Sequence, residues 1–334
     1  MAGASLGRSG PRSSRVGLGF WQAGGRLWGA RRMSQADVEA VVSAAASEGL
    51  NLFDTAEVYG GGRSEELLGA ALRKLGLASG SVVISKVAGF RVSEGDIVGA
   101  ARRIKSRLGF APTVLLHHWP PPRWADPCRP LRGLERAVVE GLAEYYGLSN
   151  YGESILDRVL ECARRVEPVL DQVQYSLAYR TPELGVKPLL DRHGMALVAW
   201  SPLAKGALAG LREPRAPAQR MDPVFREASR DEGLQEALAR IAGKRGVTKA
   251  QVALAWLVAK GAFPIPGTTK PSRAREYGGA AKLELSEEEV RVLDEASSRY
   301  LKRWGGRYQT GFTRLTSITP SILQRLLINL VGGL

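Results

Sequence analysis

Asn51-Leu52-Phe53-Asp54-Thr55-Ala56-Glu57-Val58-Tyr59-Gly60 contains the end of a predicted strand and the loop that follows it. The apolar run 50–53 is typical of a short buried strand, which delivers Asp54 at its end and Tyr59 in the following loop. A turn of three glycines, 60–62, comes next, and Ser64 is expected to cap a helix with apolar residues on one face. Together these features predict one βα unit.

The same pattern recurs along the chain. Apolar runs of four to six residues alternate with amphipathic helices, which indicates a buried parallel sheet. Eight strands are predicted, and this number favours an α/β fold of the closed (β/α)8 TIM-barrel type. An open dinucleotide-binding sheet is disfavoured because Gly17-Leu18-Gly19 lacks the third glycine of its fingerprint. The predicted strands are 16–21, 50–53, 82–86, 114–118, 145–150, 169–174, 196–200 and 262–266.

The predicted barrel leaves a segment at each end of the chain. We expect residues 1–15 to form an N-terminal hairpin or tail, 16–298 the barrel, and 299–334 a C-terminal tail. Within that tail, 321–331 has apolar residues at helical spacing and is expected to dock as an amphipathic helix with its apolar face buried. It is shorter than the roughly 20 apolar residues of a membrane span. Segment 300–307 is expected to border a substrate pocket.

Composition narrows the possible partners. The 334 residues are 44% hydrophobic and 24% charged, with a formal net charge of +14. Because the basic residues are scattered, a phosphate-bearing cofactor or an Arg-rich surface is a better explanation than nucleic acid. Cys128 and Cys162 are too few for a disulfide framework and form no metal-ligand pair. We therefore expect no metal, no nucleic acid and no membrane partner, a cytoplasmic location, and a monomer or weak homo-oligomer.

Four polar groups follow three successive predicted strands: Asp54 with Tyr59, then Lys86, then His118. In a barrel these groups would meet at the C-terminal mouth. An ammonium beside a phenol is expected to lower its pKa, a carboxylate would orient that ammonium, and an imidazole could donate a hydrogen bond to a carbonyl oxygen. The set suits protonation of an oxygen that becomes negative as hydride reaches carbon. A cofactor must supply the hydride.

A series of motifs between about residues 6 and 293 resembles the aldo-keto reductase family in order and spacing. The resemblance implies a (β/α)8 barrel that reduces carbonyls with NADPH. It implies Tyr59 as the general acid, Lys86 and Asp54 as groups that tune it, and His118 as the group that orients substrate. The motifs are Gly17-Leu18-Gly19 with Trp21, Asp54-Thr55-Ala56-Glu57-Val58-Tyr59-Gly60, Ile84-Ser85-Lys86, His118-Trp119-Pro120, Gly147-Leu148-Ser149-Asn150, Gln172-Val173-Gln174-Tyr175, Trp200-Ser201-Pro202-Leu203 and Ile265-Pro266-Gly267-Thr268.

The resemblance also implies an NADP(H) site. Trp200 stands where the family stacks an aromatic ring on the nicotinamide, and Arg273 matches an arginine aimed at the 2′-phosphate. Three positions depart from the family pattern. Asp171, whose side chain should face away, and Tyr277, near the adenine, each replace an Asn, and Thr113 stands where many relatives have Asp, at a position expected to be structural. The residues expected at the cofactor are Gly19, Phe20, Trp21, Asp54, Ser149, Asn150, Gln172, Trp200, Ser201, Pro202, Leu203, Lys205, Gly206, Pro266, Gly267, Thr268, Thr269, Lys270, Arg273, Glu276 and Tyr277.

The substrate is expected to be an aldehyde or ketone with an apolar body, held by aromatic side chains. Two other functions stay open. One is a non-catalytic, NADP-binding regulatory or redox-sensing barrel subunit. The other is a barrel enzyme of different chemistry that takes a phosphorylated substrate, and the complete set of four polar groups argues against it. The aromatic side chains expected to line the substrate pocket are Trp28, Phe90, Trp119, Trp124, Tyr151 and Trp304.

Overall fold

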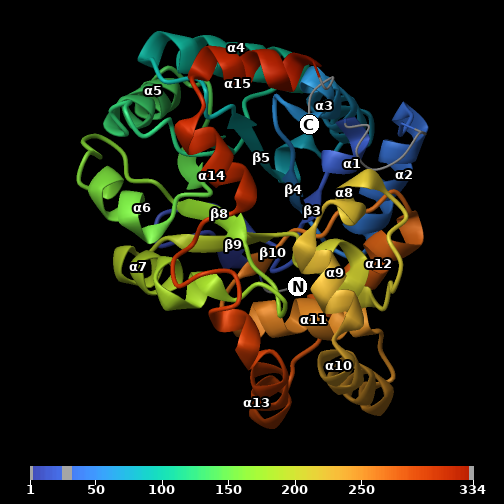
Figure 1. Ribbon diagram of the computed structural model, residues 1–334. Helices are drawn as coiled ribbons and strands as arrows, with labels where there is room; N and C mark the ends of the chain where they lie inside the picture. Colours follow the sequence, from blue (N-terminus) through green and yellow to red (C-terminus); the bar gives the residue numbers. More distant parts are fainter. Residues whose placement is uncertain (1–2, 25–31, 331–334) are drawn as a thin grey trace.

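The computed structural model describes residues 3–24 and 32–330, and its centre is a barrel of eight parallel strands (Figure 1). Each strand pairs with the next in sequence. The barrel closes where Gly17 N donates to Pro264 O and Gly19 N to Pro266 O, at 2.9 and 3.1 Å. This confirms the predicted (β/α)8 fold. The strands are β3 (Leu18–Gly19), β4 (Leu52–Asp54), β5 (Val82–Val87), β6 (Val114–His117), β7 (Tyr145–Ser149), β8 (Leu170–Gln174), β9 (Ala196–Trp200) and β10 (Phe263–Pro264).

Helices surround the strands, and the larger core lies between the two layers. A second apolar cluster, including Leu52, Ile84 and Val198, belongs to the strands themselves. Within the described residues, no helix has both the length and the hydropathy needed to cross a bilayer. The helices are α1 (Trp21–Gly24), α2 (Gln35–Ser47), α3 (Arg63–Lys74), α4 (Glu94–Leu108), α5 (Cys128–Val139), α6 (Glu153–Leu160), α7 (Val186–His193), α8 (Pro217–Arg220), α9 (Pro223–Arg230), α10 (Glu232–Arg245), α11 (Lys249–Ala259), α12 (Pro271–Ala280), α13 (Glu287–Ala296), α14 (Gly311–Ile318) and α15 (Ser321–Leu330).

The turn between β4 and α3 differs from the prediction in one detail. Gly62, with φ of 99°, is the N-cap of α3, so Ser64 lies inside the helix. Its buried hydroxyl donates to Phe20 O at 2.9 Å and accepts from Thr55 Oγ1 at 2.8 Å. Ser64 therefore ties the helix to the loops after β3 and β4 instead of capping it.

A small antiparallel hairpin precedes the barrel. It consists of β1 (Ala4–Ser5) and β2 (Arg12–Ser13). Leu6 is fully buried in the cluster that contains the first residues of several strands, and Arg8 N donates to Gly194 O. The hairpin thus covers the N-terminal ends of the strands and leaves the opposite end of the barrel open.

The two cysteines, for which no disulfide framework was expected, form a single disulfide. Cys128 is the first residue of α5, and Cys162 follows α6. Their Cα atoms are 5.6 Å apart, within the range that a disulfide can span. The bond therefore links the start of α5 to the segment that follows α6.

Asp171 on β8 faces away from the barrel mouth, as expected, and is completely buried. The backbone N–H groups of Tyr151 and Gln172 interact favourably with its carboxylate, but not enough to offset its burial. Burial raises the pKa of Asp171 well above its usual value. The folded protein therefore binds this proton more tightly than the unfolded chain does. Stability from this group is complete below the unfolded pKa of about 4 and falls as pH rises toward the folded pKa.

We therefore expect Asp171→Asn to raise the free energy of unfolding at neutral pH by about 1–3 kcal/mol, because it removes a buried acid that takes up a proton on folding. The gain should shrink as pH falls toward about 4. Urea unfolding of both proteins at matched pH values measures the difference. Asp157→Asn on exposed α6 is the control and should show little change. A gain that does not vary with pH would contradict the titration argument.

Candidate active site

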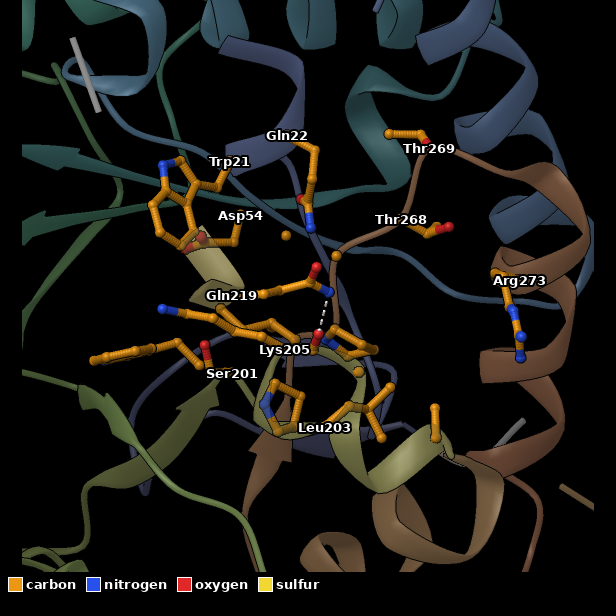
Figure 2. Close-up of a pocket in the computed structure, with 18 of the residues that line it drawn as sticks. Trp21, Gln22, Asp54, Ser201, Leu203, Lys205, Gln219, Thr268, Thr269 and Arg273 are labelled. Carbon is orange, nitrogen blue, oxygen red and sulfur yellow. Dashed lines mark hydrogen bonds between the residues drawn. The ribbon is translucent and has the colours of Figure 1, made fainter. Parts of the chain in front are cut away.

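A cavity of about 850 Å³ opens at the C-terminal ends of the strands (Figure 2). Its wall comes from β3, β4 and β7 to β9, from the loops after these strands and after β6 and β10, and from α12 and the start of α14. Figure 2 shows Trp21 and Asp54 toward one end and Thr268, Thr269 and Arg273 toward the other. The size and elongated shape suit a ligand with two chemically different ends.

Asp54, Tyr59 and Lys86 meet at one end of this cavity. The Lys86 ammonium donates to Asp54 Oδ1 at 2.6 Å and lies 3.3 Å from the Tyr59 hydroxyl. Asp54 Oδ2 accepts from Gln172 Nε2 at 2.7 Å. Lys86 is completely buried behind Asp54 and Tyr59, and these two residues reach the cavity. The buried ion pair therefore fixes the phenol from behind.

The electrostatics at Tyr59 differ from the prediction. Burial raises the pKa of the Tyr59 phenol well above its usual value, and the negative charge of Asp54 raises it further. Lys86 was expected to lower this pKa. Its ammonium, however, is paired with Asp54, and the pair has no net charge to favour phenolate. The Tyr59 phenol is therefore neutral at physiological pH.

His118 lies beside the phenol at the end of β6. The two rings are 5.5 Å apart between centroids and meet edge to face. Burial lowers the pKa of His118 well below its usual value, with a further contribution from the Lys86 charge, so the imidazole is neutral. Within the described ranges, its buried Nδ1 has no hydrogen-bond partner. The neighbouring His117 is committed to the structure, because its ring nitrogens contact Tyr151 and Arg91 O.

A hydrogen-bond network around Asn150 forms the adjacent wall. Asn150 Nδ2 donates to His118 O and to Ser149 Oγ, both at 3.0 Å. Its Oδ1 accepts from Trp200 Nε1 at 3.0 Å and from the Tyr308 hydroxyl at 2.9 Å. The amide orientation is thus set by the end of β7, the end of β9 and the C-terminal tail together.

The far end of the cavity has the features of an anion site. Thr268, Thr269 and Lys270 precede α12, whose N-terminus faces the cavity, and Arg273 lies in its first turn. A helix N-terminus and a guanidinium both favour phosphate oxygens. The Arg273 guanidinium is half exposed and pairs with Glu276 at 2.5 Å.

The segment between β9 and α8 has an unusual backbone. In the described residues, four non-glycine positions have left-handed φ: Asn150, Ser201, Ala204 and Lys205. All four lie on or next to the cavity wall. Backbone of this kind clusters at ligand sites. Lys205 is held by Asp222 at 2.8 Å and by Gln219, which donates to its carbonyl oxygen.

Most of the predicted cofactor residues line this one cavity. Among the predicted catalytic and cofactor residues, three do not: Lys86 is behind the wall, Phe20 is buried in the core, and Glu276 reaches the site only through Arg273. Those on the wall are Gly19, Trp21, Asp54, Ser149, Asn150, Gln172, Trp200, Ser201, Pro202, Leu203, Lys205, Gly206, Pro266, Gly267, Thr268, Thr269, Lys270, Arg273 and Tyr277, with Tyr59 and His118.

The predicted aromatic substrate wall is different in the structure. Phe90 and Trp119 are buried together behind the cavity, and Trp124 points into solvent with 63% of its surface exposed. Trp304 stacks on Tyr179 and donates to a backbone carbonyl. Tyr151 is buried against His117, and Trp28 lies outside the described residues.

Several wall residues were not singled out from the sequence. Gln22 is one of them, and its buried Oε1 has no hydrogen-bond partner in the part of the chain that the structure describes. The tail reaches the cavity at Thr310 and Phe312 and not at 300–307. Segment 212–230 supplies three wall residues. The additional wall residues are Gln22, Ala209, Gly210, Leu211, Arg215, Gln219, Met221, Ile265, Thr310 and Phe312.

The fold and the site define a barrel protein of the oxidoreductase type, with a neutral phenol, a buried ion pair and an imidazole at one end of a nucleotide-sized cavity. The sequence profile of the Aldo/keto reductase family matches residues 15–298. Pyridoxal reductase, chloroplastic, from Arabidopsis thaliana is 33% identical over 311 residues, which cover 87% of this chain and 85% of the relative. The chain therefore belongs to the aldo-keto reductase family.

Two further similarities bear on function. An aldo-keto reductase from Klebsiella pneumoniae, solved in complex with NADPH, has a TM-score of 0.72 and 25% identity, covering 93% of this chain and 99% of that one. A probable voltage-gated potassium channel subunit beta from Oryza sativa subsp. japonica is 28% identical over 311 residues, covering 87% of this chain and 90% of the relative. The family thus includes a protein described as a channel subunit.

Proposed function

We propose that this protein reduces an aldehyde or ketone to an alcohol with NADPH, in a reversible reaction with Tyr59 as the general acid. The observation that carries the proposal is the neutral Tyr59 phenol, which opens to the cavity while Lys86 and Asp54 hold it from behind. Bound NADPH would supply the hydride. A phenol is a suitable donor because the reaction places negative charge on the substrate oxygen.

Each neighbouring group has a separate task in this proposal. Lys86 can keep donating a hydrogen bond to the Tyr59 oxygen as the proton leaves, and Asp54 keeps Lys86 in place. His118, being neutral, can donate a hydrogen bond to the substrate oxygen and orient the carbonyl. Ser149, Asn150 and Gln172 are placed to hold a carboxamide beside this oxygen. Trp200 provides an aromatic surface at the same place.

The residues also fit the rest of NADPH. Within residues 3–24 and 32–330, the buried amide oxygen of Gln22 at the wall has no hydrogen-bond partner, and the amide lies so close to Gly267 that a side chain at position 267 would displace it. The α12 N-terminus, Lys270 and Arg273 would hold the 2′-phosphate. A regulatory, NADP-binding subunit remains the alternative, and the channel-subunit relative supports considering it.

Turnover separates the two functions. Full-length protein is incubated with NADPH and a panel of aliphatic and aromatic aldehydes, and loss of NADPH absorbance is recorded. Steady oxidation that requires aldehyde supports the enzyme. NADPH binding without turnover of any aldehyde or ketone would favour the regulatory subunit.

Tyr308→Phe tests the proposed role of Asn150. The Tyr308 hydroxyl donates to Asn150 Oδ1 and accepts from Gln174 N at 2.9 Å. Losing one such bond should weaken NADPH binding by about 0.5–1.5 kcal/mol, or roughly 2- to 12-fold. Tyr179→Phe, which removes only a bond to Gln309 O, is the matched control. Equal NADPH affinity for Tyr308→Phe and wild type, measured by fluorescence titration, would contradict this positioning role.

A further inference from the structure

The C-terminal helix α14 presents its apolar side chains to solvent. Leu315 and Ile318 are 58% and 60% exposed, and Phe312 is partly exposed where it borders the cavity. The buried side of the same helix carries Thr313 and Thr316, whose hydroxyls bond to the helix backbone. The helix therefore turns its apolar face to solvent and its polar face to the protein, the reverse of a helix that packs on a core.

Helix α15 has the same inverted arrangement. The sequence predicted that its apolar face would be buried, but Ile322 is 78% exposed and Leu326 is 54% exposed. The helix docks instead through Gln324 and Ile328, which lie one turn apart on its other side. The exposed apolar side chains of the two helices, called here the tail ridge, are Phe312, Leu315, Ile318, Ile322, Leu323, Leu326 and Leu327.

Hydrogen bonds fix the orientation of the tail ridge. Gln324 is buried, accepts from Trp119 Nε1 at 2.9 Å and donates to Thr316 O and Thr319 O at 2.8 and 2.7 Å. Rotating α15 to bury its leucines would break all three bonds and expose Ile328. The apolar face is thus held outward by satisfied polar contacts.

The tail ridge is the main apolar surface of the described chain. Of the twelve large apolar side chains that are exposed there, seven lie between residues 312 and 327, so they form a concentrated face and not a scattered background. Figure 1 shows α14 in front of the strands. Ile328 packs with Val58, Phe90 and Trp119, which follow the C-terminal ends of strands. The tail ridge therefore surrounds one side of the barrel mouth.

The tail segment that carries the ridge has charges of only one sign. Residues 299–334 contain no Asp or Glu. Arg314 and Arg325 are exposed on α14 and α15, and Arg123 is exposed on the loop whose backbone bonds to Ser317 O. Within the described ranges, none of these three arginines forms an ion pair with an Asp or Glu. The basic residues of this segment are Arg299, Lys302, Arg303, Arg307, Arg314 and Arg325.

We propose that the tail ridge docks onto an anionic lipid surface, with the barrel mouth turned toward the membrane. Exposed leucine and isoleucine on one helical face, flanked by unpaired arginines, are the features of a helix that lies in the bilayer interface without spanning it. Anionic headgroups would neutralise the arginines that form no ion pair within the described ranges. The earlier expectation of no membrane partner considered spanning length alone, which an interfacial helix does not need.

A second copy of the chain fits this face less well. In a symmetric dimer the same patch meets itself, so Arg314 and Arg325 of each copy would approach those of the other with no acid from residues 299–334 between them. Like charges brought together in this way oppose association. The proposal does not depend on carbonyl reduction and can be tested separately.

The experiment sediments the full-length protein with vesicles of phosphatidylcholine, with or without about a third phosphatidylserine. Binding is expected only to the vesicles that contain phosphatidylserine. It should weaken when NaCl is raised from about 0.1 to about 1 M, because the Debye length falls from about 10 to about 3 Å. Equal sedimentation with anionic and neutral vesicles would overturn the proposal.

Variants locate the contact. Ile322→Asp with Leu326→Asp, and separately Arg314→Gln with Arg325→Gln, should each lower the partition coefficient about tenfold or more. Leu75→Asp with Val139→Asp changes exposed apolar residues outside the tail ridge and should leave binding unchanged. Thermal melting checks that each variant is folded. If the control pair lowers binding as much, or if a dimer dissociates with Ile322→Asp and Leu326→Asp, the tail ridge is not a lipid-binding face.

Discussion

Tyr59→Phe is expected to lower the rate of carbonyl reduction by about 10²–10⁴, the usual contribution of a positioned general acid. Tyr59 is the member of the constellation that combines a transferable proton with direct access to the cavity. Lys86 is behind the wall, and Asp54 faces Lys86 and Gln172. Phenylalanine keeps the ring and removes the one polar contact that the hydroxyl makes within the described residues, at 3.3 Å from Lys86. The loss should therefore appear in turnover and not in folding.

The measurement compares kcat for one aldehyde with NADPH affinity and melting temperature in the same preparation. NADPH affinity should stay within about twofold of wild type, because the phenol is not among the groups proposed to hold the cofactor. Tyr145→Phe is the matched control and should retain full activity, because Tyr145 lies at the N-terminal end of β7, away from the cavity. Turnover of Tyr59→Phe within about threefold of wild type would show that another group donates the proton.

The architecture could be predicted because its signals are local. Each apolar run such as 50–53 has a strand's length and precedes an amphipathic helix, and eight repetitions require a closed barrel. Asp54 and His118 could be assigned to the mouth for the same reason: the C-terminal ends of parallel strands all lie at one side. Once the topology is known, these positions follow from the chain order.

The direction of the Tyr59 pKa shift was predicted incorrectly because it depends on distances and burial. The sequence shows that Lys86 is near, but not that Asp54 takes up its charge at 2.6 Å. Pairing within the triad removes the field that would have favoured phenolate, and burial then dominates. Knowing that Asp54, Tyr59 and Lys86 lie close together does not determine which two of them form the ion pair.

The directions of side chains in the loops and in the tail could not be predicted from the sequence either. Trp119 was expected on the substrate wall, but it turns inward to Gln324, over 200 positions away in the chain. Periodicity identified an apolar face on α15 without showing which face would dock, because a single buried Gln324 with three hydrogen bonds outweighs that preference. Such choices depend on partners that are distant in sequence.

Arg273→Ala is expected to reduce the preference for NADPH over NADH by about 1.5–3 kcal/mol, or roughly 10- to 150-fold, the range for a hydrogen bond to a charged group. The two cofactors differ by the 2′-phosphate, and Arg273 sits in the first turn of α12 at the end of the cavity far from Trp21 and Asp54 (Figure 2). NADH affinity should change little. In the described chain the guanidinium pairs with Glu276, so phosphate would replace or share that carboxylate.

Dissociation constants for both cofactors, measured at one fixed salt concentration, give the discrimination directly, because ion pairing of exposed groups depends on ionic strength. Arg275→Ala is the matched control, since it removes the same charge from the exposed side of α12 and does not reach the cavity. Arg275→Ala should keep the wild-type ratio. If Arg273→Ala weakens NADPH and NADH equally, the arginine acts on a part that both cofactors share. If neither affinity changes, the 2′-phosphate is bound elsewhere, and Lys270 at the N-cap of α12 is the next residue to replace, because its charge lies at the same helix end.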